Sequence, residues 1–179
     1  MIPLSAPDIT GAEIAAVDAV LRSGRLSLGP ELEAFEQALA VRHGVPDAVA
    51  VSSGTAALHL ALLALGIGPG DEVIVPSFAF IAVANAVAQA GATPVFAEIG
   101  AETLNLDPAA VERAITPRTR AMLVVHTFGV PAEMDALADL ARRHNLKLIE
   151  DACEAVGAQF DGRPVGSWGD LAVLGFYPN

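Results

Sequence analysis

Short, continuously apolar segments alternate with helix-like segments along almost the whole chain, and this alternation constrains the fold more than any other feature. A strand without polar positions has no face for solvent, so it must be covered on both sides, as in a parallel sheet between helices. The pattern therefore predicts an α/β fold, a three-layer α/β/α domain with a mainly parallel sheet. The expected strands are 48–52, 72–76, 93–97, 121–125, 146–150 and 171–174.

Capping signals mark where the expected helices begin and end. Thr10 and Glu13 have capping-box spacing at the start of the first helix, which Gly24 would end. Asp107 is placed to cap another helix, with Pro108 at its first position. Further helices are expected through 32–39, over 55–65 and 79–91, and in a segment that ends near 145, whereas 160–170 is expected to be turn and loop.

The composition excludes several classes of protein. With 21 acidic and 10 basic residues, the net charge is −11, which argues against a nucleic-acid-binding surface. Hydrophobic residues make up 53% of the chain, but the most apolar stretch, 73–97, is interrupted by Pro, Gly, Asn and Gln and does not fit a membrane span. The N-terminus has no secretory signal pattern, and a single cysteine, Cys153, cannot form an internal disulfide. We expect a cytoplasmic protein.

A candidate anion site lies at 52–57, where a predicted strand is followed by a helix. The first N–H groups of a helix have no intrahelical partner, and Gly54 lets the backbone approach a ligand there. The hydroxyl of Thr55 adds a donor. The same residues also fit an ordinary strand-to-helix turn capped by Ser53 or Thr55, and the local pattern alone favours that simpler interpretation.

Other polar and aromatic side chains follow strands at the same predicted edge. Asp151 comes directly after a strand and either faces a ligand or caps the next segment, while Glu154 either reaches the same crevice or is solvated. Phe78 or Phe80 could stack on a planar cofactor or pack in the core. His126 is either a ligand-edge or a structural histidine. No zinc-ligand set and no Ser-His-Asp arrangement is present, so no metal is expected.

In this order, five segments of the chain resemble the DegT/DnrJ-type sugar aminotransferases, a branch of the fold-type I enzymes that use pyridoxal 5′-phosphate (PLP). The resemblance runs almost from end to end. The segments are Ser53-Gly54-Thr55-Ala56-Ala57-Leu58-His59, Gly68-Pro69-Gly70-Asp71-Glu72-Val73-Ile74-Val75-Pro76-Ser77, Ile149-Glu150-Asp151-Ala152-Cys153-Glu154-Ala155, Gly166-Ser167-Trp168-Gly169-Asp170 and Phe176-Tyr177-Pro178-Asn179.

The resemblance implies roles for particular residues toward the cofactor. Gly54, Thr55 and Ala56 would hold the phosphate, Phe80 would stack on the pyridine ring, and Asp151 would contact its nitrogen. An ionised Asp151 would keep that nitrogen protonated and preserve the ring as an electron sink, which makes it a catalytic residue as well as a cofactor ligand.

Two positions depart from the family pattern. Glu154 occupies a position where relatives often place Gln or His near the cofactor's phenolic oxygen, and a carboxylate there would repel a phenolate unless it were protonated or paired. Gly175 stands where many members have a serine that binds phosphate, so this contact must come from backbone, water or another residue.

The resemblance places the Schiff-base lysine directly after Asn179, and Lys147 cannot replace it because it lies in a predicted strand. We therefore expect an N-terminal helix and loop (1–30) and a PLP-binding large domain (31–179) truncated at its C-terminal side, with the small domain outside this sequence. The expected activity is amino transfer from an amino-acid donor, glutamate, to a keto group of a nucleotide-linked deoxysugar, in a homodimer with shared active sites. The alternatives are a PLP-dependent sugar dehydratase with histidine in place of that lysine, and a non-catalytic regulatory relative.

Overall fold

The computed structural model describes residues 6–177. The chain forms two compact units, one comprising 51–175 and the other comprising 1–50 with 176–179. The predicted domain boundary between residues 30 and 31 stays a prediction.

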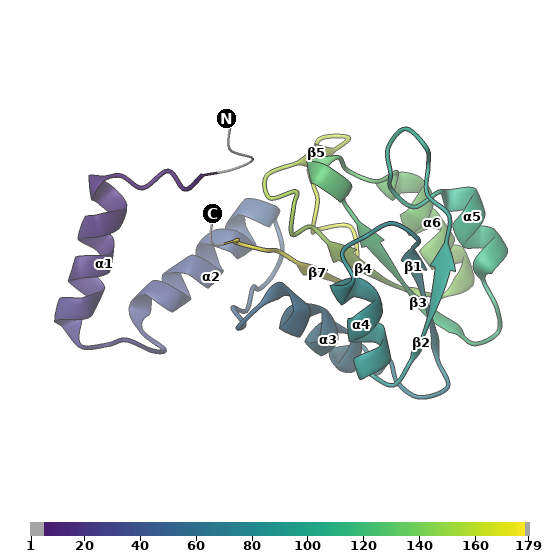
Figure 1. Ribbon diagram of the computed structural model, residues 1–179, viewed down its shortest axis with the longest axis horizontal. Coiled ribbons are helices and arrows are strands. Elements are labelled where there is room, and N and C mark those ends of the chain that lie inside the picture. The colour runs from purple at the N-terminus through teal and green to yellow at the C-terminus, as the bar shows by residue number, and fades with distance from the viewer. Residues whose placement is uncertain (1–5, 178–179) are drawn as a thin grey trace. The chain divides into compact units, whose positions relative to one another are not determined.

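The larger unit is built on a five-stranded parallel sheet (Figure 1). Its strands pair in the order β2-β1-β3-β4-β7, so the connections cross over instead of joining neighbours as hairpins. This arrangement agrees with the apolar, two-sided strands of the sequence. The strands are β1 (Glu72–Pro76), β2 (Thr93–Ala97), β3 (Thr119–Val125), β4 (Lys147–Asp151) and β7 (Leu171–Val173).

Helices cover both faces of this sheet, as Figure 1 shows. On one face, α3 (Gly54–Ala64) and α4 (Ala82–Gln89) pack with Val73 and Val75 in one apolar cluster. On the other face, α5 (Pro108–Ala114) and α6 (Met134–His144) pack with Ile74 in a second cluster. Alternate residues of β1 thus enter opposite cores, as the two-residue period of a strand requires. The predicted three-layer α/β/α fold is confirmed.

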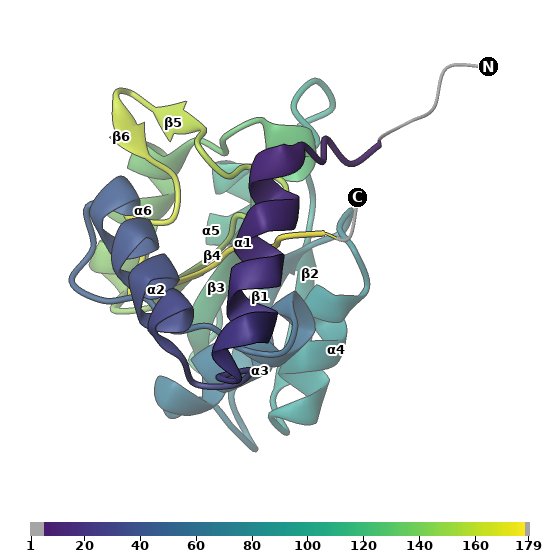
Figure 2. The same ribbon diagram turned by 90° about the vertical axis from the view of Figure 1, so that its left-hand side faces the viewer.

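Two parts of the predicted secondary structure were wrong. Residues 48–52 form no strand, because a strand needs the N–H and C=O groups of a neighbour and no strand among residues 6–177 pairs with this segment. The expected loop at 160–170 contains a short hairpin of β5 (Gln159–Phe160) and β6 (Arg163–Pro164), seen in Figure 2. Its turn residues Asp161 and Gly162 have φ values of 49° and 75°, which a two-residue primed turn requires.

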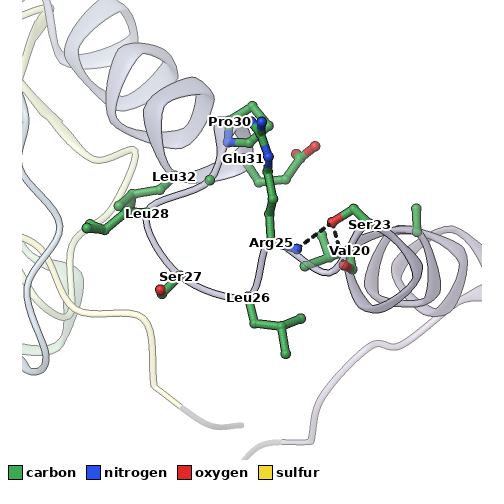
Figure 3. A pocket seen from close by; sticks show the side chains of 11 residues that line it. Val20, Ser23, Arg25, Leu26, Ser27, Leu28, Pro30, Glu31 and Leu32 are labelled. Carbon is green, nitrogen blue, oxygen red and sulfur yellow. Dashed lines mark hydrogen bonds between the residues drawn. The ribbon is translucent and has the colours of Figure 1, made fainter.

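The smaller unit contains α1 (Gly11–Ser23) and α2 (Pro30–His43). The capping box of Thr10 and Glu13 is present, and Gly24 ends α1 in the left-handed conformation, as predicted. The apolar stripe of α1, formed by Ile14, Val17 and Leu21, stays exposed. Figure 3 shows a hollow along residues 19–32, where the Ser23 hydroxyl donates to the Val20 carbonyl and accepts from the Arg25 N–H. This hollow contains none of the predicted site residues.

Candidate active site

The N-terminus of α3 presents free backbone donors. Ser53 caps the helix, and its hydroxyl oxygen accepts the N–H of Ala56 at 3.1 Å. Within 6–177, the N–H groups of Gly54 and Thr55 have no protein acceptor. An anion at this helix end would therefore bind to Gly54 and Thr55, whereas the N–H of Ala56 is already engaged.

Cys153 connects this helix end with the segment that follows β4. A Cβ atom added at Gly54 would lie 3.2 Å from the sulfur of Cys153, and one added at Gly175 would lie 2.9 Å from its Cβ. Both contacts are closer than side chains normally make, so the two glycines give Cys153 its space. The structure thus brings Gly54, Cys153 and Gly175 together, with Asp151 two residues before Cys153.

Asp151 lies at the carboxyl end of β4 and is buried. It shares a face of the strand with Ile149, whose side chain belongs to the apolar cluster around α3 and α4. Its Oδ1 atom accepts the N–H of Cys153 at 3.1 Å. Burial raises the pKa of Asp151, and the hydrogen bonds from Cys153 offset part of that effect. A cation placed beside this carboxylate would stabilise its ionised form.

The thiol of Cys153 stays protonated in this environment. Burial raises its pKa, and the nearby charge of Asp151 raises it further. The protonated thiol is therefore a small packing group at this edge of the sheet. Sequence reasoning considered Cys153 only for disulfides and missed this role.

A buried hydrogen-bond network lies on the opposite side of β4. Glu150 is inaccessible to solvent and accepts the N–H groups of Gly166, Trp168 and Gly169 at 2.7, 2.6 and 2.8 Å. The imidazole Nε2 of His126 is 3.1 Å from the same carboxylate. Because Nδ1 of His126 accepts the Ala132 N–H at 3.1 Å, we assign the proton to Nε2, which donates to Glu150.

This network explains why an acidic residue interrupts an apolar strand. Burial by itself would raise the pKa of Glu150, but the hydrogen bonds from His126, Gly166 and Gly169 outweigh burial and hold the pKa below its ordinary value. The carboxylate anchors the loop before β7 to β4. His126 is therefore structural, which was one of its two predicted roles. Sequence reasoning assigned no role to Glu150, although its position within an apolar strand was a visible signal.

Three phenylalanines lie at the same edge of the sheet. Phe80 is 76% exposed in the turn between β1 and α4, and this turn makes α4 begin at Ala82 instead of the predicted 79. Phe78 packs edge-on against Phe128, which follows β3, with ring centroids 6.1 Å apart. The Phe80 ring is thus open to solvent, and its stacking on a planar cofactor stays a prediction. The Phe128 ring was not identified from the sequence.

Glu154 is exposed, and one of its oxygens is engaged. Its Oε2 atom accepts the N–H of Phe128 at 2.8 Å. This hydrogen bond fixes the turn that carries Phe128, a use of Glu154 that the sequence did not indicate.

The sequence profile of the DegT/DnrJ/EryC1/StrS aminotransferase family matches residues 7–179. The chain belongs to this family. The resemblance inferred from the five segments is confirmed. Between residues 6 and 177, no group of His, Cys, Asp and Glu is arranged to hold a metal ion.

Relatives of known activity support this assignment. The chain is 55% identical over 92% of its length to dTDP-3-amino-3,4,6-trideoxy-α-D-glucose transaminase of Streptomyces venezuelae, and covers 43% of that protein. It is 53% identical over 86% of its length to GDP-perosamine synthase of Caulobacter vibrioides, and covers 41% of it. The PLP form of Spr1654 from Streptococcus pneumoniae superposes with a TM-score of 0.88 at 36% identity, over 96% of this chain and 47% of that one. The chain thus spans less than half the length of these relatives.

Proposed function

We propose that this chain is the cofactor-binding part of a PLP-dependent aminotransferase that delivers an amino group, taken from glutamate, to a keto group of a nucleotide-linked deoxysugar. The observation that carries the proposal is the buried Asp151 carboxylate, connected through Cys153 to the N-terminus of α3, where the N–H groups of Gly54 and Thr55 are free. Family membership and the two transaminase and synthase relatives support the reaction and the nucleotide-sugar substrate class. The PLP form of Spr1654 supports the cofactor.

The described residues fit this cofactor. The phosphate would bind at the N-terminus of α3, where Gly54 and Thr55 have N–H groups to donate and glycine permits close approach. The Ala56 N–H could also donate to this phosphate only if it gave up its hydrogen bond to the Ser53 hydroxyl oxygen. When bound, PLP supplies an electron sink for cleavage of bonds at the amino-bearing carbon.

Asp151 would hold the proton on the pyridine nitrogen. Its raised pKa describes the protein with no cation beside it, and a pyridinium at this carboxylate would favour the ionised form. Phe80 would stack on the ring, which its exposure permits. Glu154 would lie near the phenolic oxygen, and its hydrogen bond to Phe128 leaves only the Oε1 atom for that contact.

The Schiff-base lysine of the proposed enzyme lies outside residues 1–179. Lys147 does not serve, because it begins β4, at the end opposite Asp151, and its Nζ atom is paired with Asp170 at 2.7 Å. Replacing Lys147 by arginine should therefore leave the cofactor's absorbance unchanged in the full-length protein.

The full-length protein tests the proposal directly. Purified with PLP, it should show the visible absorbance of a lysine-bound cofactor, and borohydride should abolish that absorbance. L-Glutamate should then convert the cofactor to its amine form, with release of 2-oxoglutarate. A colourless protein that PLP does not change would contradict the proposal.

We further propose that the full-length protein is a homodimer that works in the cytoplasm. The exposed stripe of Ile14, Val17 and Leu21 on α1 supports a contact with further protein. No helix formed by residues 6–177 has the length and apolar character needed to cross a membrane. Sedimentation velocity of the full-length protein at micromolar concentration should give twice the mass of one chain, and a monomer would contradict the dimer.

A further inference from the structure

The turn after β3 holds an exposed aromatic side chain in a disfavoured backbone conformation. Phe128 has φ of 54° and ψ of 28°, in the left-handed region that bulky residues avoid. Its side chain is 69% exposed, so burial of the ring does not account for the conformation. Backbone outliers of this kind persist where the surroundings impose them, and they gather at functional sites.

Hydrogen bonds from outside the turn impose this conformation. The side chain of buried Asn105 spans the turn, because its Oδ1 accepts the Thr127 N–H at 2.9 Å and its Nδ2 donates to the Val130 carbonyl at 2.9 Å. Glu154 accepts the Phe128 N–H between these two contacts. The backbone of Phe128 is thus fixed from two separate parts of the chain.

The turn lies directly beside Asp151. Residue 126 donates its N–H to the Asp151 carbonyl at 3.1 Å. A Cβ atom added at Gly129 would lie 3.2 Å from the Glu154 carbonyl oxygen, so the turn packs closely against the segment after β4. With Phe78 packed edge-on against it, the Phe128 ring forms an apolar wall at the edge that carries Asp151.

We infer that Phe128 is a specificity-determining residue that contacts the apolar C–H face of the deoxysugar ring, and that Glu154 and Asn105 position it. The inference rests on the proposed function. Of the two proposed substrates, glutamate is short and charged at both ends, whereas a deoxysugar ring has lost hydroxyl groups and offers an apolar face that suits an aromatic wall. Because the turn contacts the strand that ends in Asp151, the Phe128 ring would lie near the sugar, which carries the reacting carbon, and not near the nucleotide base.

The test uses the full-length holoenzyme and dTDP-3-amino-3,4,6-trideoxy-α-D-glucose, the compound in the name of the Streptomyces venezuelae relative. In this half-reaction the probe gives its amino group to the cofactor and becomes the ketone, while the cofactor aldehyde becomes the amine. The absorbance change at a series of probe concentrations gives an apparent Kd. Phe128→Ala should raise this Kd roughly 10- to 100-fold, a usual range for a lost apolar contact. The Kd for L-glutamate and the affinity for dTDP alone should not change.

Three further variants separate the ring from its support. Phe128→Gly should raise the Kd for the probe as much as Phe128→Ala does. It should not lower the melting temperature, because glycine adopts a positive φ without strain. The Kd for the probe should be about fivefold higher in Glu154→Ala than in Glu154→Gln, because the amide oxygen of Gln still accepts the Phe128 N–H. Leu60→Ala, which truncates an exposed apolar side chain on α3, is the matched control and should leave the Kd unchanged.

Each contrary result identifies what failed. A wild-type enzyme that reacts with both glutamate and the probe, together with Phe128→Ala and Phe128→Gly variants that keep the probe Kd, would overturn the inference alone. Loss of dTDP affinity or of the glutamate half-reaction in those variants would place Phe128 at the base or the cofactor and would also overturn it. A wild-type enzyme inert to both compounds would overturn the proposed function and the inference with it.

Discussion

Replacing Glu150 by glutamine changes one atom of the side chain but should disrupt the network that anchors the loop before β7. The carboxylate accepts three backbone N–H groups and the imidazole of His126. A glutamine oxygen can serve only two of these four donors, since its amide nitrogen is itself a donor. His126 cannot change tautomer so that Nε2 accepts from that nitrogen, because its Nδ1 already accepts the Ala132 N–H.

Two buried donors therefore lose their acceptor whichever way the amide is turned. Each unsatisfied donor costs about 1–3 kcal/mol, so the variant should lose roughly 2–6 kcal/mol of stability, with about 3 kcal/mol as the working figure. Hydrogen exchange in the full-length protein should show this locally. The amides of Gly166, Trp168 and Gly169 should exchange about 100-fold faster, since each 1.4 kcal/mol is a factor of ten.

The exposed Glu102 provides a matched control. Glu102→Gln makes the same chemical change at the surface and should shift stability by no more than about 0.5 kcal/mol. The wild-type contribution also has a defined pH dependence. Because the folded-state pKa of Glu150 is lowered, its stabilisation is present above the ordinary value of 4.5 and is lost as the pH falls through the folded pKa. Unchanged exchange at the three amides in Glu150→Gln would refute this account of the network.

Three other predictions follow from the site. Asp151→Asn should lower the rate of amino transfer by about 10²–10³-fold. The melting temperature of the apo protein at pH 7 should not fall. The raised folded-state pKa of Asp151 contributes stability below pH 3.8 that is lost as the pH rises, and Asn removes that dependence. Mass-mapped alkylation of native protein at pH 8 should modify Cys153 at least about tenfold more slowly than in urea, and rapid labelling would contradict its raised pKa. Gly175→Ser should destabilise by about 1–3 kcal/mol through overpacking, and a double-mutant cycle with Cys153→Gly should show strong coupling, whereas additive effects would argue against the contact.

The sheet was predictable because its strands carry their signal locally. Five of the six expected strands form, and β1 and β2 have the predicted bounds. The segment 48–52 has the same apolar character, yet strand formation also depends on a neighbour supplied by another part of the chain, which composition does not reveal. The β5–β6 hairpin did carry a local signal, the pair Asp161-Gly162.

The candidate site divides in the same way. Asp151 was predictable at this edge because it ends β4, and such positions follow from strand ends alone. Gly54 follows no strand, and only its close approach to Cys153 in the folded chain brings it to the same region. The acceptor role of Glu150 depends on loop residues 16 to 19 positions away, and that of Glu154 on a turn 26 positions away. Such pairings have no spacing rule in the sequence, so only the folded chain identifies them.

The two departures from the family pattern are better explained by these contacts than as losses of function. Glycine at 175 supplies no hydroxyl, but a side chain there would collide with Cys153, whose backbone N–H donates to Asp151. Glutamate at 154 places a negative charge near Asp151, but its carboxylate also holds the Phe128 turn. In both cases a residue that looks unfavourable toward the cofactor supports a neighbour that faces the same edge of the sheet. Under the proposed function, we therefore expect substrate selectivity to depend on the Phe128 turn, while Gly54, Thr55 and Asp151 would bind the cofactor.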